Sequence, residues 1–143
     1  MKKIFLLLFL LILPNIANSA CDNPLKDGVE YTNCRFSDGQ DLQGSYLPNS
    51  NLSFASFIQV NFDKSIMMNS NLSFGTFPES TFIRANLYES VLVGANFEKT
   101  NFTGANLTSS NMTNANFDGA NLIGATWTNG ETCGPESIGV CNK

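Results

Sequence analysis

The chain of 143 residues has no histidine and few charged residues. Asp, Glu, Lys and Arg make up 14% of it, and the net charge is −4. It has no glycine-rich phosphate loop after a strand, no cluster of carboxylates, and no base beside its many Ser and Thr hydroxyls. Because acid–base, nucleophilic and phosphate-binding chemistry need such groups, we predict a non-enzyme without cofactor, metal site or catalytic residues. The acidic balance also argues against nucleic-acid binding.

A period of five residues dominates the middle of the chain. From Leu42 to Trp127 every fifth residue is large and apolar, at all eighteen positions. Ala, Ser, Gly or Thr stands two residues earlier at sixteen of them, and Asn lies between the two at ten. A helix repeats every 3.6 residues and a strand every 2, so the period predicts a repeat architecture that turns a corner in each unit. We expect the Asn side chains to hydrogen-bond the turn backbone.

Residue type also sorts in steps of twenty, as in Phe57, Phe77, Phe97 and Phe117. Twenty residues should therefore make one four-sided coil, and eighteen units make about 4.5 coils. Stacked coils should lie about 4.8 Å apart and hydrogen-bond along the axis as parallel strands do. The predicted core columns hold Phe57, Phe62, Phe77, Phe82, Phe97, Phe102, Phe117, Leu52, Leu72, Leu92 and Trp127.

Units such as Ala95-Asn96-Phe97 and Ala105-Asn106-Leu107 resemble the pentapeptide-repeat family over about residues 40–129. The resemblance implies an all-β fold, a right-handed quadrilateral parallel β-helix. We expect disulfide-linked caps at both ends of this solenoid, because an uncapped end exposes an unpaired edge and an open apolar core. The expected organisation is a signal peptide (1–20), an N-terminal cap (21–39), the β-helix (40–129) and a C-terminal cap (130–143).

Residues 1–20 have the features of a secretory signal peptide. Lys2 and Lys3 precede an apolar run of ten residues, Ile4 to Leu13, and Ala17-Asn18-Ser19 offers a small-residue cleavage site. Ten residues are too few to span a bilayer as a helix. We therefore expect export to the periplasm or the outside medium of a bacterium, without a membrane anchor. The alternative is a lipoprotein signal that ends at Cys21, but the middle Asn stands where such signals usually have Leu.

The four cysteines flank the repeats in two close pairs. An even number in an exported chain indicates disulfides, and of the three possible connectivities we predict Cys21–Cys34 and Cys133–Cys141. A metal site is the weaker alternative, since spacings of thirteen and eight do not match zinc motifs. Tyr31 and Phe36 are candidate plugs for the N-terminal end, with Phe36 one residue out of phase. The run from Gly124 to Asn142 resembles a C-terminal cap of exported members of the family.

Apolar side chains also gather at outward positions on the two sides that carry Leu47 and Leu52. The candidate binding patch consists of Tyr46, Phe54, Ile66, Met68, Phe74, Tyr88, Val91 and Val93. Aromatic residues and Met on one half of a rod predict a protein interface or a self-association face. Alternatively, Phe54 stacks on Phe74 only to stabilise the ladder, or residues 21–39 fold over the patch.

Three functions follow from these observations. The first is an exported module that binds a protein or a cell-envelope component through the patch. The second is a structural spacer rod without a single partner. The third comes from the resemblance, because some pentapeptide-repeat proteins mimic duplex DNA and occupy the DNA groove of a topoisomerase. A duplex as long as the predicted rod, roughly 22 Å, carries about 13 charges. Residues 40–129 hold six acidic and three basic residues, which disfavours that mimicry.

Overall fold

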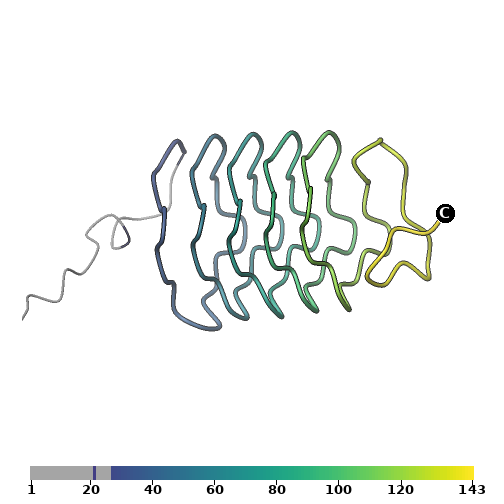
Figure 1. The fold of residues 1–143 in the computed structure, drawn as a ribbon, viewed down its shortest axis with the longest axis horizontal. Coiled ribbons are helices and arrows are strands. Elements are labelled where there is room, and N and C mark those ends of the chain that lie inside the picture. The colour runs from purple at the N-terminus through teal and green to yellow at the C-terminus, as the bar shows by residue number, and fades with distance from the viewer. Residues whose placement is uncertain (1–20, 22–26) are drawn as a thin grey trace, which may run out of the picture.

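The computed structural model describes Cys21 and residues 27–143. These residues wind into a rod of stacked coils, seen from the side in Figure 1. Within them there is no helix and no continuous strand, because a turn interrupts the chain every five residues and each β element is a one-residue bridge. No helix in the described part is long and apolar enough to cross a membrane. The predicted signal peptide, residues 1–20, lies outside the described residues.

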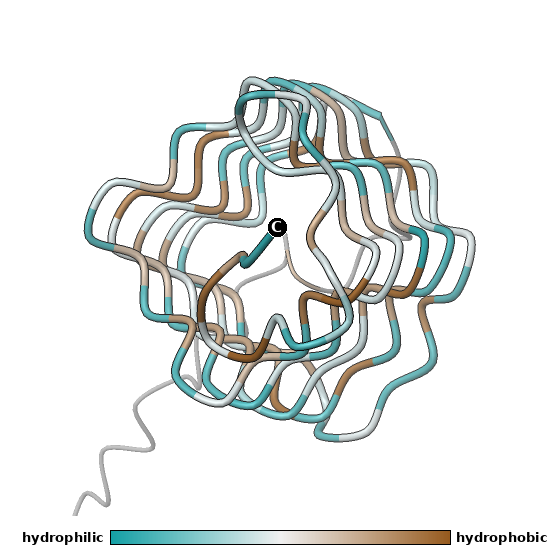
Figure 2. Cartoon of the chain, turned by 90° about the vertical axis from the view of Figure 1, so that its right-hand side faces the viewer, coloured by the Kyte–Doolittle hydropathy of each residue, from teal (hydrophilic) through white to brown (hydrophobic). Residues whose placement is uncertain are grey.

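Parallel bridges join residues that are twenty apart, from Asp41 with Asn61 to Asn106 with Thr126. Each coil therefore has four sides, and the end-on view in Figure 2 shows successive coils in register. Amides and carbonyls pair along the axis, as in the bond of 2.7 Å from the Leu72 amide to the Val91 carbonyl. The predicted parallel β-helix is the observed fold, while its right-handed sense stays a prediction of the resemblance.

A four-residue turn begins at each core residue. In the turn from Leu92 to Ala95, the Ala95 amide donates to the Leu92 carbonyl at 3.1 Å. Gly94, the third residue of this turn, has a φ of 63°. A positive φ at that position defines a type II turn and favours Gly or Asn. This third position forms the corner of each unit, and half of the eighteen corners from Gly44 to Asn129 hold residue types other than Gly and Asn.

The outward Asn residues hold these turns. Asn96 is typical, because its Oδ1 accepts the backbone amide of Glu98 at 3.0 Å. The same bond, to the amide two residues on, is made by all ten Asn residues at this place in the unit, which confirms their predicted structural role. They are Asn51, Asn61, Asn71, Asn86, Asn96, Asn101, Asn106, Asn111, Asn116 and Asn121.

Stacked phenylalanines fill the core. The ring centroids of Phe57 and Phe77 are 5.3 Å apart, and those of Phe77 and Phe97 are 5.0 Å apart, with nearly parallel planes. Full burial of one such side chain contributes roughly 1.5–3 kcal/mol. Trp127, at the end of its column, is half-buried and meets the Phe117 ring at 5.7 Å. The other predicted core residues are at most 9% exposed: Phe57, Phe62, Phe77, Phe82, Phe97, Phe102, Phe117, Leu52, Leu72 and Leu92.

Buried hydroxyls replace the turn hydrogen bond at two corners. The Ser70 hydroxyl donates to the Leu47 carbonyl of the preceding coil at 2.5 Å and accepts the Ser50 amide at 3.3 Å. The Ser80 hydroxyl does the same one corner later, with the Phe57 carbonyl at 2.7 Å and the Val60 amide at 3.0 Å. A small polar residue in the core can therefore cross-link two coils, which is why Ser as well as Ala occupies these positions.

The stack extends towards the N-terminus beyond the five-residue pattern. Arg35 pairs with Ser56 and Glu30 with Asn51, at spacings of 21 instead of twenty, so one extra residue lies between Phe36 and Leu42. Phe36 stacks on Phe57 with centroids 4.2 Å apart, and Tyr31 is fully buried. Residues 30–36 thus pair and pack like the repeats, within the segment expected to form a cap.

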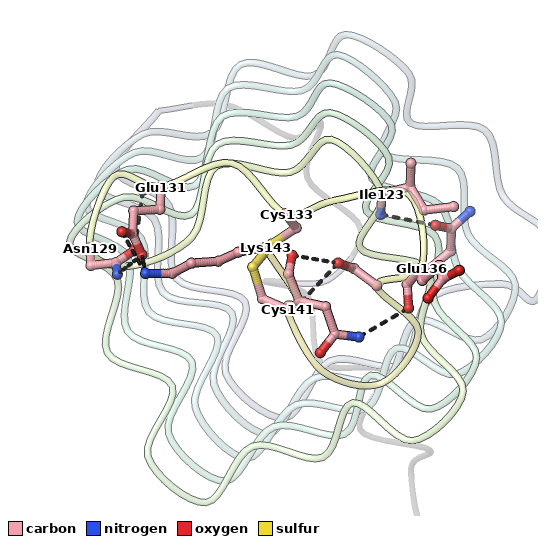
Figure 3. Close-up of a disulfide and its surroundings, with 10 residues drawn as sticks. Ile123, Asn129, Glu131, Cys133, Glu136, Cys141 and Lys143 are labelled. Atoms are coloured by element: carbon pink, nitrogen blue, oxygen red, sulfur yellow. Dashed lines mark hydrogen bonds and ion pairs between the residues drawn. A yellow bond between two sulfur atoms is a disulfide. The ribbon is translucent and has the colours of Figure 1, made fainter.

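Both predicted disulfides are present, Cys21–Cys34 and Cys133–Cys141. The first occupies the Cys21 sulfur that a lipoprotein anchor would need, so this pairing is incompatible with the lipidation alternative. The second closes the C-terminal cap, shown in Figure 3. The cap folds back antiparallel on the last units, with bridges from Asn121 to Ile138 and from Thr126 to Thr132.

Candidate binding surface

All eight residues of the predicted patch lie on the outside of the rod, because each is a bridge or turn residue of its unit. Tyr46, Phe54 and Phe74 are the most exposed, at 58%, 55% and 52%. The other five, which are less exposed, are Ile66, Met68, Tyr88, Val91 and Val93. Tyr46, Phe54 and Phe74 are therefore the patch residues most open to contact from outside the rod.

The first group of patch residues lies on the side that carries Leu47. Tyr46 and Ile66 form a bridge pair one coil apart. Met68 and Tyr88 belong to the turns that follow on this side. A hydrogen bond with the Glu89 carboxylate, and the negative charge of that group, raise the pKa of the Tyr88 phenol. This group therefore combines apolar surface with a polar rim.

The second group is centred on an external pair of aromatic rings. Phe54 and Phe74 stack at the same corner of successive coils, with centroids 5.1 Å apart and planes 16° from parallel. Gly94 occupies the same corner one coil after Phe74, and a Cβ atom added to it would lie only 2.7 Å from Cε1 of Phe74. The ring thus covers the glycine backbone. Val91 and Val93 precede that glycine and complete the Phe54–Phe74 cluster, which consists of Phe54, Phe74, Val91 and Val93.

Both phenylalanines have a strained backbone. Phe54 has a φ of 58° and Phe74 a φ of 57°, in the left-handed region that bulky residues rarely adopt. Such a conformation costs roughly 1–3 kcal/mol for each residue, whereas one stacked aromatic pair contributes about 0.5–1.5 kcal/mol. Stacking alone therefore offsets only part of the cost. The same corner holds Gly94 and Asn114 in later coils, so the fold does not require Phe there.

A polar strip separates the two groups. Between Met68 and Phe74 the chain passes Asn69 at a corner and Asn71 on the next side, and Asn71 caps the turn by accepting the Ser73 amide at 3.0 Å. The corner residues Asn49, Asn69 and Glu89 thus lie between the two groups, while Asn71 pairs with Val91 and belongs to the second side. The Phe54–Phe74 cluster is the one that sequence reasoning could have singled out, because its rings occupy the third turn position where Gly or Asn is favoured.

The sequence matches the family of pentapeptide repeats, in 8 copies, over residues 41–73, 65–104, 80–118 and 100–129. The chain belongs to the pentapeptide-repeat family. No curated protein matches this pentapeptide-repeat protein in sequence.

Solved structures of the family are similar to this pentapeptide-repeat protein. QnrB1, a plasmid-mediated fluoroquinolone resistance protein, is 19% identical with a TM-score of 0.47, over 70% of this chain and 66% of QnrB1. HetL of Nostoc sp. strain PCC 7120, involved in heterocyst differentiation regulation, is 16% identical with a TM-score of 0.42, over 74% and 63% of the two chains. A protein of the Arabidopsis thaliana thylakoid lumen is 22% identical with a TM-score of 0.35, over 64% and 67%. The chain spans less than two thirds of the length of QnrB1 and HetL.

Among the described residues, no three or more His, Cys, Asp or Glu side chains gather in one place. Ion pairs in that part of the chain are confined to exposed side chains, such as Lys99 with Glu98 at 3.3 Å. The apolar clusters are therefore the distinctive feature of the lateral surface.

Proposed function

We propose that this pentapeptide-repeat protein is an exported, non-enzymatic binding module that contacts a protein or cell-envelope component through the Phe54–Phe74 cluster. The observation that supports this most is the strained conformation of two half-exposed phenylalanines, which neither burial nor stacking accounts for. Aromatic side chains with exposed edges are the usual anchors of protein interfaces. The first group, around Tyr46 and Ile66, would contribute a second contact.

The proposed location is the periplasm or the outside medium of a bacterium. The two disulfides support it, because such bonds persist in oxidising compartments. The proposed signal peptide, residues 1–20, would direct the chain there.

The test replaces both phenylalanines by asparagine, Phe54→Asn with Phe74→Asn. Asn tolerates a positive φ, so the backbone should keep its conformation and the variant should fold at least as well as wild type. The matched control is Gln59→Asn with Glu79→Asn, which changes the next corner of the same two coils. Those side chains also touch each other, with Gln59 donating to Glu79 at 2.9 Å.

Each protein is cross-linked in envelope and culture-medium fractions, and captured partners are purified and titrated. We expect wild type and the control to bind one partner and the Phe variant to lose it, by at least tenfold in Kd. If the folded Phe variant binds as tightly as wild type, the cluster is ladder packing. If none of the three binds a specific partner, the protein is a spacer rod.

A further inference from the structure

The C-terminal cap closes only part of the end of the rod. On the sides that carry Leu122 and Trp127, cap carbonyls accept the amides of the last units. The Leu122 amide donates to Ser137 at 2.8 Å, and the Trp127 amide donates to Glu131 at 2.7 Å. Figure 2 looks onto this end, with the final residues crossing the middle of the rod.

The other two sides end without such partners. Inside the rod, the Leu92 amide donates to the Asn111 carbonyl at 2.7 Å and the Gly94 amide to the Thr113 carbonyl at 2.9 Å. One coil later the equivalent amides belong to Met112 and Asn114. Neither donates to any acceptor among the described residues, and the same is true of the Phe117 and Gly119 amides. On the Phe117 side, Gly139 of the cap lies against the backbone, because a Cβ atom added to it would be 3.5 Å from the Phe117 carbonyl oxygen and 3.6 Å from the Gly119 nitrogen. We therefore call only residues 110–114 the open edge.

The core is also less well covered at the open edge. Leu52, Leu72 and Leu92 are fully buried, but Met112, the last member of the same column, is only half-buried. Nor does the open edge carry the usual protection against strand pairing. Natural sheet edges are blunted by charged residues or Pro, whereas the outward side chains on the Met112 side are Asn111, Thr113 and Asn114.

We propose that the open edge binds an extended segment of another polypeptide by parallel strand addition. Every inner coil shows what this template accepts, because each is paired with the next by the same pattern of amides and carbonyls. The bound segment would offer carbonyls to the Met112 and Asn114 amides and an amide to the Ser110 carbonyl. A Leu or Phe in it would cover Met112, and a small residue two positions earlier would fit beside it. We therefore expect the bound segment to be uncharged and to contain small, polar and large apolar residues at these spacings.

The probe is a nine-residue peptide with the sequence of residues 100–108, acetylated and amidated, which has two such units and no charge. The control peptide is N-methylated at the residues corresponding to Asn101 and Asn106, which removes two backbone donors and keeps every side chain. Each is titrated into the ¹⁵N-labelled, disulfide-bonded protein. We expect the amides of Met112 and Asn114 to shift, and to exchange with solvent at least tenfold more slowly, with the probe but not with the N-methylated peptide.

Two variants test the site. Met112→Glu places a carboxylate beneath the apolar side chain of the bound segment and should weaken binding at least tenfold, whereas Met112→Leu should bind as wild type does. Unchanged slow exchange of the Leu92 and Phe97 amides shows that both variants are folded. The Phe54→Asn, Phe74→Asn variant should still bind the peptide, so the open edge and the proposed lateral interface can fail independently.

The proposal is overturned if the probe leaves the Met112 and Asn114 amides unchanged at concentrations up to about 1 mM. It is also overturned if the N-methylated peptide binds equally well, because strand addition requires those donors. The two amides could also become protected without peptide as the protein concentration rises, together with a doubled mass in light scattering. The edge would then bind a second copy of this chain, and the proposal of a different polypeptide as the partner would be wrong.

Discussion

The Phe74 ring lies against Gly94 so closely that a Cβ atom added to the glycine would stand 2.7 Å from Cε1 of the ring. Gly94 also has a φ of 63°, so an added side chain would meet both backbone strain and a clash. Two features of the external corner, the exposed ring and the small residue under it, therefore depend on each other.

Gly94→Ala should lower the free energy of unfolding by roughly 2–4 kcal/mol, the sum of left-handed strain and overpacking. Gly104→Ala is the matched control. It has a φ of 66°, but its added Cβ would meet only Cγ of Arg84 at 3.5 Å, so about 1–2 kcal/mol is expected there. Urea unfolding measures both. A double variant with Phe74→Asn should recover the difference, and equal losses in the two alanine variants would show that the ring does not press on residue 94.

Ser65→Ala should leave stability unchanged or raise it by about 1 kcal/mol. The Ser65 hydroxyl is the one buried side-chain polar atom without a hydrogen-bond partner among the described residues. Later coils place Ala85 and Ala105 at the same position, so alanine fits the site. Ser80→Ala is the contrasting variant. It loses the bonds to the Phe57 carbonyl and the Val60 amide, and we expect a loss of about 1–3 kcal/mol in urea unfolding. A destabilised Ser65→Ala protein would indicate an unseen partner for that hydroxyl.

The fold was predictable because each buried column appears in the sequence as large apolar residues spaced twenty positions apart. Phe77 and Phe97 stack since both are core residues twenty apart, and spacing alone identifies them. The extra residue between Phe36 and Leu42 was visible as a break in phase, but its accommodation between two coils needed the backbone pairing. The contact of Phe74 with Gly94 was beyond sequence reasoning, because it depends on which way an exposed ring tilts. The incomplete cover of Met112 likewise depends on the path of the cap.

Phe97→Asp should abolish cooperative folding of the coils around it. Phe97 is fully buried and its ring stacks on Phe77 at 5.0 Å and on Phe117 at 5.3 Å. A carboxylate there has no partner in an apolar column, and its desolvation adds to the loss of a phenyl ring worth about 3–5 kcal/mol. Phe54→Asp, on the outside of the rod, should melt near the wild-type temperature. Circular dichroism melts compare the two, and a Phe97→Asp protein that melts like wild type would refute the assignment of this column to the core.

The C-terminal cap should loosen in acid through Glu131. Its carboxylate accepts hydrogen bonds from Lys143 at 2.7 Å and from Asn129 at 2.6 Å, and these bonds lower the pKa of Glu131 below its ordinary value of 4.5 (Figure 3). A carboxyl group with a lowered pKa in the folded state stabilises that state fully above pH 4.5, and the contribution disappears as pH falls through the lowered pKa. The effect should be small, because both partners are exposed and water screens the pair.

Amide exchange of Trp127 and Gly124, which bond to the cap, measures this loosening between pH 6 and pH 3 after correction for intrinsic exchange. In Glu131→Gln the corrected exchange should not change over that range, because the titrating group is gone while the Glu131 carbonyl that accepts the Trp127 amide remains. Glu136→Gln, which changes an exposed cap carboxylate without such partners in the described part of the chain, should keep the wild-type pH dependence. If Glu131→Gln loosens in acid as wild type does, another carboxyl group controls the cap.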